Sequence, residues 1–252
     1  MPFPNHPEKH GAEPVVTPER SAEYAGSEVT DPPDAVVLCY SRGLMECLTG
    51  GDDGRTVEQY YGDLYVFEDG AVGVVGNFGI GAPVTATVME DLIADGVGTF
   101  LSVGFAGCLS ERVGMGEVVL AREAVRDEGT SHHYLEPERD VRASEPLLAT
   151  ARDTLRERGE PFHVGPTWTT DAIYRETRPE IERYAAEGVL TVEMEAAATF
   201  AVAAHRGVEA GAMFVASDYL GPEEWEPRFD EAEEHLHRLG DIARAALASH
   251  LE

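Results

Sequence analysis

Residues 35–95 switch between short apolar runs and longer stretches with apolar side chains at helical spacing. The run AVVLCY at 35–40 suits a buried strand, and 42–48 has the spacing of a helix that follows it directly. An alternating segment at 61–67, the Asp69-Gly70 turn and apolar residues at 71–75 together predict a β-hairpin. The run GIGAP at 79–83 then ends a strand, and Pro83 lies where a helix over 84–95 would begin.

The rest of the chain repeats this alternation. Apolar runs predict strands at 99–105, 117–125, 162–164, 190–192 and 210–217. Helical spacing predicts helices over 146–159, 179–187, 195–207 and 231–251. Such a pattern predicts an α/β fold in which a mixed, mostly parallel, twisted sheet is flanked by helices in three layers. Ligands of such sheets bind where strands end and turns gather.

The first 33 residues differ from the others. They hold seven of the fifteen prolines and no sustained apolar period, which predicts an irregular arm over 1–33. A chain of 252 residues can bury one sizeable core. Residues 34–252 are therefore expected to form a single domain with one active site.

Charge narrows the range of partners. The chain carries 47 acidic and 19 basic residues, a formal net charge of −28. This argues against nucleic acid and anionic membranes, because each phosphate contact would be made against a repulsive field. Lys9 is the only lysine. Salt shortens the Debye length to about 3 Å at 1 M and would screen the self-repulsion, so a salt-rich cell interior is expected. An ordinary acidic protein is the alternative.

Cysteines and termini suggest an intracellular chain. Cys39, Cys47 and Cys108 cannot make an even disulfide framework and are not spaced as metal ligands. The first residues lack a signal-peptide pattern, and no stretch reaches the roughly 18 apolar residues of a membrane span. A cytoplasmic protein with no metal centre is expected.

The stretch TVEMEAAA at 191–198 is the most informative for chemistry. Glu193 and Glu195 flank Met194 at a strand-to-helix junction, just before a helix too apolar to face water. Carboxylates placed there must be paired, capping or catalytic. From spacing alone, a favourable interaction with the helix dipole explains them as well as catalysis does.

This stretch, with Ser217-Asp218 at the end of the next strand, resembles the signature of the nucleoside phosphorylases. That family includes purine nucleoside and uridine phosphorylases and related nucleosidases. Three further segments agree: GIGAP at 79–83 resembles the family's glycine turn, DEGTSHHY at 127–134 a loop of uridine-phosphorylase-like members, and TTDAIY at 169–174 the base-pocket segment. The similarity runs from about residue 35 to the end.

The resemblance implies roles for the two key acids. N-glycosidic cleavage passes through a sugar with oxocarbenium character, and hydrogen bonds to its 2-hydroxyl strengthen as charge develops. Glu195 would accept from the ribose hydroxyls, and Asp218 would protonate the departing base, although a loop carboxylate ending a strand is the other interpretation. His133 in a polar loop and aromatic residues near strand ends also have surface or core explanations. The expected substrate-binding residues are Glu193, Met194, Phe105, Thr170, Ile173, Tyr174, Ser217 and His133.

The phosphate-binding segments depart from the family pattern. Members usually carry a Pro-Gly-Asp-Pro-x-Arg stretch after the first strand, where this chain has CYSRG at 39–43. A second phosphate arginine and a threonine are replaced by Ser102 and Phe105. Arg42 lies at the start of a predicted helix and could bind phosphate in place of the missing arginines. The alternative is that it is a solvated charge at the helix start. The expected phosphate contacts are Arg42, Gly43, Gly79 and Gly104.

A phosphorylase acting on a purine nucleoside or uridine is therefore the main hypothesis, with inorganic phosphate as co-substrate and no cofactor. If no arginine reaches the site, water could replace phosphate, with Glu46 as a poorly matched activating residue. A nucleoside-binding protein without turnover is the third hypothesis. Arg175, Arg178 and Arg228 are candidates for a contact to the base or to Asp218, and the sequence does not choose among them. The resemblance also implies a homo-oligomer built from dimers, up to a hexamer.

Overall fold

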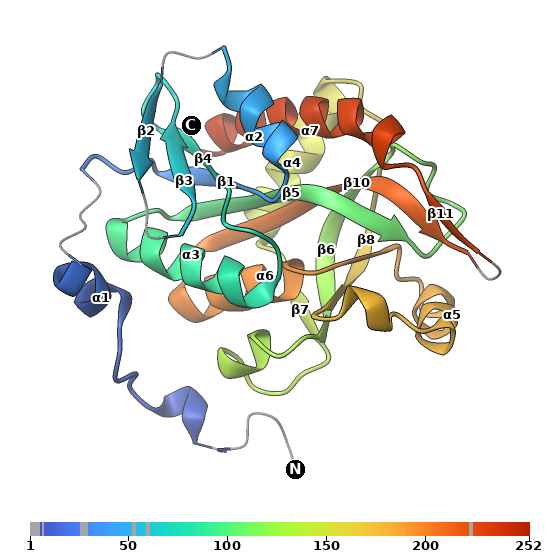
Figure 1. The fold of residues 1–252 in the computed structure, drawn as a ribbon, viewed down its shortest axis with the longest axis horizontal. Coiled ribbons are helices and arrows are strands. Elements are labelled where there is room, and N and C mark those ends of the chain that lie inside the picture. Colours follow the sequence, from blue (N-terminus) through green and yellow to red (C-terminus); the bar gives the residue numbers. More distant parts are fainter. Residues whose placement is uncertain (1–5, 7, 26–29, 52–53, 59–60, 222–223) are drawn as a thin grey trace.

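The computed structural model describes residues 6, 8–25, 30–51, 54–58, 61–221 and 224–252, and strands alternate with helices through most of them (Figure 1). The strands are β1 (Ala35–Cys39), β2 (Arg55–Glu58), β3 (Asp63–Val66), β4 (Val72–Gly76), β5 (Thr99–Cys108), β6 (Val118–Asp127), β7 (Asp140–Arg142), β8 (Phe162–Thr170), β9 (Thr191–Glu193), β10 (Glu209–Leu220) and β11 (Trp225–Pro227). The α-helices are α1 (Pro18–Ala25), α2 (Arg42–Thr49), α3 (Ala82–Asp95), α4 (Glu145–Glu157), α5 (Arg178–Ala186), α6 (Ala196–Arg206) and α7 (Phe229–His250). Short 3-10 turns are η1 (Lys9–Gly11), η2 (Ser131–His133) and η3 (Ile173–Arg175).

The strands form one mixed sheet that closes on itself in its middle. Its order is β11-β10-β6-β8-β9-β5-β1-β4-β3-β2, with β7 beside β6, and β10 also pairs with β5. That extra pairing makes a closed ring of β5, β10, β6, β8 and β9, while β1, β4, β3 and β2 extend from β5. The sheet is mixed as predicted, but parallel pairs do not predominate: five of the described pairings are parallel and six antiparallel.

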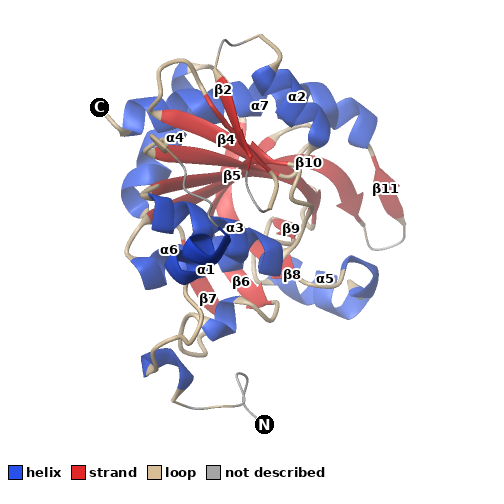
Figure 2. Ribbon diagram, turned by 60° about the vertical axis from the view of Figure 1, so that its left-hand side comes forward, coloured by secondary structure: helices blue, strands red, loops and turns tan. Residues whose placement is uncertain are grey.

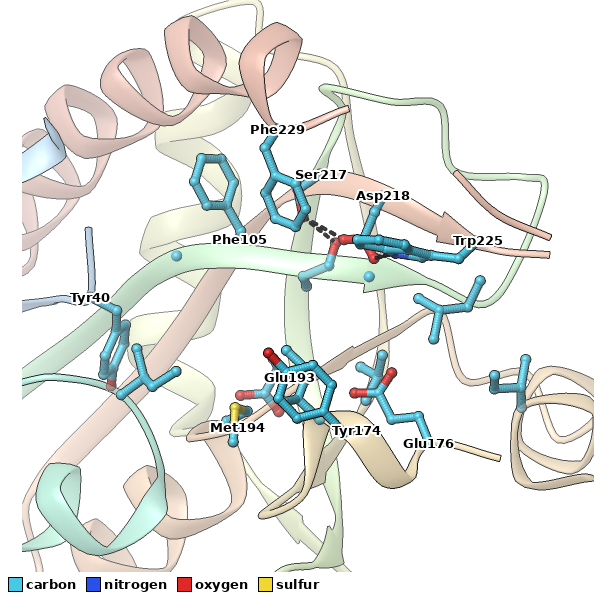
Figure 3. A pocket seen from close by; sticks show the side chains of 18 of the residues that line it. Tyr40, Phe105, Tyr174, Glu176, Glu193, Met194, Ser217, Asp218, Trp225 and Phe229 are labelled. Carbon is cyan, nitrogen blue, oxygen red and sulfur yellow. Dashed lines mark hydrogen bonds between the residues drawn. The ribbon is translucent and has the colours of Figure 1, made fainter. Parts of the chain in front are cut away.

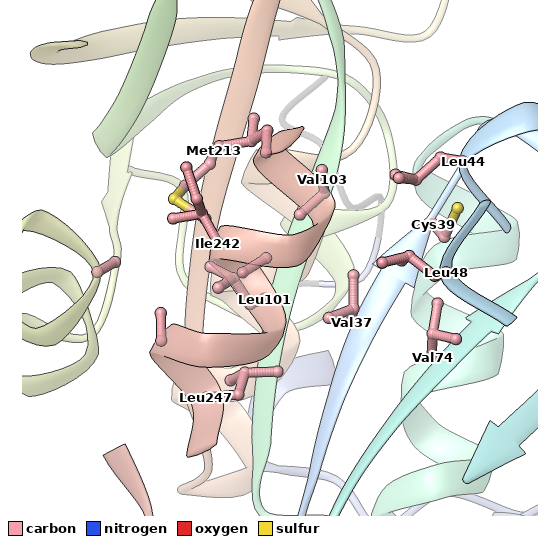
Figure 4. Close-up of a cluster of buried hydrophobic side chains, with 14 of the residues drawn as sticks. Val37, Cys39, Leu44, Leu48, Val74, Leu101, Val103, Met213, Ile242 and Leu247 are labelled. Atoms are coloured by element: carbon pink, nitrogen blue, oxygen red, sulfur yellow. The ribbon is translucent and has the colours of Figure 1, made fainter. Parts of the chain in front are cut away.

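Helices cover both faces of the sheet because buried strand residues point alternately to each side. Val37 and Cys39 of β1 pack with Leu44 and Leu48 of α2 and with α7 (Figure 4). Val36 and Leu38 of the same strand belong to the opposite cluster, with α3 and α6. Figure 2 shows the resulting layers, with α2, α4 and α7 on one side and α3 and α6 on the other. The three-layer prediction is confirmed.

Most predicted elements are present, with shifted ends. The hairpin of β3 and β4 and the helix after the glycine turn are where the pattern placed them. The strand predicted at 162–164 was too short, since β8 runs to Thr170. Its second half is buried in the closed ring and carries polar threonines, which hid it from an apolar pattern.

The N-terminal arm was wrongly predicted to be irregular throughout. Within it, α1 spans Pro18–Ala25, and η1 is a further short turn. Pro18 occupies the first helical position, where proline's missing N–H and fixed φ are tolerated. Helix α1 contacts α3, so part of the arm lies against the domain.

None of the helices in the described ranges combines the length and the apolarity that crossing a membrane requires.

Candidate active site

A cavity of about 640 Å³ opens where three parallel strands end. β1, β5 and β10 lie side by side in parallel, so the residues at their carboxyl ends meet at one edge. The junction between β9 and α6 closes the opposite wall. Figure 3 shows Tyr40 at one end of the cavity and Asp218, Trp225 and Glu176 toward the other, with Met194 between them.

Gly107 of β5 brings the two walls together. It pairs with Val192 of β9 on one side and with Asp218 of β10 on the other. A Cβ at this position would lie 3.2 Å from both the Asp218 carboxylate and the Val192 side chain, and closer still to Leu220. The absence of a side chain at Gly107 therefore lets two distant segments of the chain approach the same cavity.

Glu193 is used mainly by the protein itself. Its Oε2 accepts hydrogen bonds from the backbone N–H groups of Glu195 (2.8 Å) and Ala196 (2.7 Å), at the start of α6. Its Oε1 accepts one from the Thr169 hydroxyl. Burial raises the pKa of Glu193, and these hydrogen bonds partly offset that rise. The helix-start interpretation holds for this acid.

Glu195 reaches across to the glycine turn. Its Oε1 accepts a 2.6 Å hydrogen bond from the N–H of Gly81, which precedes α3 and has a positive φ of 105°. Glycine adopts this conformation without strain. Burial, and then the neighbouring Glu193 carboxylate, raise the pKa of Glu195. The acid expected at the sugar thus contacts an amide of the glycine turn at 79–83.

Asp218 lies at a break in the register between β5 and β10, which falls at Ser217. Its Oδ1 accepts from the Ser217 hydroxyl and its Oδ2 from the indole N–H of Trp225, both at 2.7 Å. The side chain is buried. Two fixed donors hold its carboxylate in one orientation at the wall of the cavity.

Aromatic and hydroxyl side chains occupy the end where phosphate was expected. The Tyr40 hydroxyl lies 3.3 Å from the Ser102 hydroxyl and accepts from Thr85 at 3.4 Å. Burial and the charge of Glu195 raise the pKa of Tyr40. The rings of Phe105 and Phe229 stack edge to face over the same wall, with centroids 5.7 Å apart. Phe105 gives the cavity an uncharged wall at this end, and Ser102 lies buried behind Tyr40, outside the lining.

The cavity brings together most of the residues singled out from the sequence. Its lining includes both acids expected to be catalytic, together with most of the expected substrate contacts and one phosphate contact: Glu195, Asp218, Glu193, Met194, Phe105, Ile173, Tyr174, Ser217 and Gly104. Glu195 and Asp218, which are far apart in the sequence, therefore share one cavity.

Five expected contacts lie outside this lining. Arg42 is exposed on the first turn of α2, and a Cβ on Gly43 would meet Glu233 of α7. Gly79 is exposed, with a φ of 94°. The Thr170 hydroxyl accepts from the Ala172 N–H, and His133 is exposed in η2. Glu46 is likewise exposed on α2 and outside the lining.

Sequence reasoning missed several lining residues, among them Tyr40, Ser41, Glu176, Trp225 and Phe229. Tyr40 and Ser41 follow β1 directly, and their position after a parallel strand was the available signal. Trp225 and Phe229 come from β11 and the start of α7, a region with no strand pattern. Glu176 directly follows η3, two residues past the base-pocket segment. Of the undecided arginines, Arg178 lines the cavity.

Comparison with known proteins agrees with this architecture. Residues 35–248 match the model of the phosphorylase superfamily. The chain is 31% identical over 206 residues to guanosine phosphorylase of Halorubrum lacusprofundi, covering 79% of this chain and 86% of that protein. It is 31% identical over 192 residues to a DeoD-type purine nucleoside phosphorylase of Myxococcus xanthus, covering 73% and 80%. With uridine phosphorylase of Salmonella typhimurium it shares 29% over 157 residues, 57% of this chain and 62% of that protein. The chain belongs to the phosphorylase superfamily.

Proposed function

We propose that the chain cleaves the N-glycosidic bond of a nucleoside by phosphorolysis, releasing a free base and ribose 1-phosphate. One observation carries this proposal: Glu195 and Asp218 line the same cavity. Its volume of about 640 Å³ lies within the roughly 300–1,000 Å³ of small-molecule sites. The names of the three relatives support the same reaction class.

The two acids suit opposite ends of a nucleoside. Glu195 would accept hydrogen bonds from the ribose hydroxyls, which become better donors as the sugar gains oxocarbenium character. Met194 lies beside it and offers a polarizable surface to the ring. Asp218 would hand a proton to the departing base, since a nucleobase leaves poorly as an anion. Phosphate would attack the anomeric carbon from the Tyr40 end, where Ser41 and Gly104 also line the wall.

Hydrolysis is the second candidate because of the charge of this lining. Among the lining residues that the structure describes, Arg178 is the one cationic side chain. It begins α5, in the half of the cavity that contains Glu176. A phosphate dianion near Glu195 would gain no arginine from these residues, whereas water needs none.

The assay that tests the proposal measures base release with phosphate present and absent. Uridine, inosine, guanosine and adenosine would each be incubated in about 1 M KCl, where the charge of −28 is screened. Phosphorolysis predicts release only with phosphate, together with stoichiometric ribose 1-phosphate. Release that is independent of phosphate would instead establish hydrolysis, and binding without release would indicate a nucleoside-binding protein.

We further propose that the enzyme works in a salt-rich cytoplasm, as a homo-oligomer and without a metal. The net charge and the guanosine phosphorylase of Halorubrum lacusprofundi support the first point. Activity and thermal stability should both rise as KCl is raised, because screening reduces self-repulsion. Light scattering gives the molar mass in the same salt, and activity should survive a chelator.

A further inference from the structure

The carboxylate of Glu176 lines the cavity and makes no hydrogen bond or ion pair with the residues that the structure describes. Glu176 directly follows η3, between the base-pocket segment and α5, and its side chain is half-buried. A carboxylate withdrawn from bulk water in this way favours a ligand that donates to it.

The position of Glu176 faces the acid already placed at the base. Figure 3 shows Glu176 across the cavity from Asp218 and Trp225. Burial, followed by the charges of Asp218 and Glu180, raises the pKa of Glu176 to about 7. Ser217 and Trp225 donate hydrogen bonds to the carboxylate of Asp218, whereas none of the described residues donates one to Glu176. A flat base between them would meet one acid at each edge.

Resting on the proposed function, we propose that Glu176 selects the base by accepting hydrogen bonds from two adjacent N–H groups, which favours guanine. An ionised carboxylate is an acceptor with two oxygens and binds paired donors well. Guanine presents N1–H beside its 2-amino group, while its N7 lies on the far side of the ring, toward Asp218.

Other bases match this carboxylate less well. Hypoxanthine presents N1–H without the amino group. Adenine turns the lone pair of N1 toward the carboxylate, which is repulsive. Uracil presents one N–H between two carbonyl oxygens. Recognition at Glu176 therefore ranks guanosine above inosine, and both above adenosine and uridine.

The test replaces Glu176 by Gln and compares nucleosides. An amide offers one acceptor and one donor, which complements the 6-amino group and N1 of adenine, whereas it cannot accept from both N1–H and the 2-amino group of guanine as a carboxylate does. The ratio of kcat/KM for guanosine to that for adenosine is expected to fall by about 10- to 100-fold in Glu176→Gln, the range given by a good bidentate contact. Glu182→Gln is the matched control, since Glu182 is exposed on α5 outside the cavity.

A second readout does not require turnover. Calorimetry with free guanine and adenine should show a loss of guanine affinity in Glu176→Gln and in Glu176→Ala, with Glu182→Gln unchanged. A wild type that prefers adenosine or uridine, or a Glu176→Gln variant with unchanged ratio and guanine affinity, overturns the inference. If guanine affinity depends on Glu176 but no nucleoside is cleaved, the inference stands and the proposed function fails.

Discussion

Replacing Asp218 by Asn is the most direct test of the proton donor. The two side chains have nearly the same shape, so the variant changes proton donation while keeping the packing. Trp225 donates only, so the Asn oxygen must face its indole N–H, and the Asn amide then faces the Ser217 hydroxyl. That hydroxyl can rotate to accept. Both contacts at Asp218 therefore survive in neutral form.

The structure sets the size of the two effects of Asp218→Asn. Hydrogen bonds to a charged group contribute roughly 1.5–3 kcal/mol and neutral ones roughly 0.5–1.5, a typical difference of about 1–1.5 for each bond, so weakening two of them should cost about 2–3 kcal/mol of stability. Loss of a general acid should lower kcat by about 10²- to 10⁴-fold, or about 2.7–5.4 kcal/mol of transition-state stabilisation. Turnover should thus fall much more than nucleoside affinity.

The assay follows base release from guanosine and from 7-methylguanosine, with thermal melting as a fold check. 7-Methylguanosine carries a positive charge on its base and leaves without a proton, so the defect of Asp218→Asn should shrink with that substrate. Ser217→Ala is the matched control, since it removes one hydrogen bond and no proton donor. A kcat within about threefold of wild type, or equal defects with both substrates, would refute the role of Asp218.

Three further predictions concern the glutamates. Glu195→Gln should lower kcat/KM by about 10- to 100-fold for ribonucleosides and by less for 2′-deoxyribonucleosides, because one of its donors is then missing; equal losses would contradict sugar recognition. Glu193→Ala leaves the buried N–H groups of Glu195 and Ala196 unpaired, so denaturant unfolding should show a loss of about 1–3 kcal/mol for each. The control Glu182→Ala, which changes an exposed glutamate, should leave the free energy of unfolding near the wild-type value. The preference for guanosine over adenosine should rise with pH through about 7, because the raised pKa of Glu176 delays formation of the accepting carboxylate. Asp218 and Glu180 are the charged groups that act on Glu176, and Glu176→Gln should flatten this profile.

Periodicity was sufficient for the layers and insufficient for the closure of the sheet. The strands β1, β5 and β10 are apolar runs buried on both faces, which made them visible in the sequence. β11 is a three-residue exposed strand that contains a proline, and β8 carries buried threonines, so neither has a strand-like apolar pattern. Ring closure depends on the pairing of β10 with β5, a long-range contact that no local pattern encodes.

The residues of the candidate site fall into the same two groups: those that a local sequence pattern identifies and those that only the tertiary structure places. Glu195 and Asp218 could be located because each belongs to a specific motif, Glu195 just before α6 and Asp218 near the end of β10. Arg42, expected at the phosphate, lies outside the cavity lining because Leu44 and Leu48 pack α2 against the core and leave Arg42 exposed. Ser41, whose hydroxyl accepts from the Leu44 N–H, lines the cavity instead. Glu176 was indistinguishable in sequence from a solvated loop carboxylate.

Glu193 and Glu195 are two residues apart but have different roles, because the backbone changes from strand to helix between them. Strand β9 ends at Glu193 and α6 begins at Ala196, so the alternation of side chains does not continue to Glu195. Glu193 turns back onto the first N–H groups of the helix, which is the stabilising position for an anion at a helix start. Glu195 points away toward Gly81 and the cavity. Its raised pKa means that donors from a sugar would stabilise its charged form, so binding of the ribose and ionisation of Glu195 are linked.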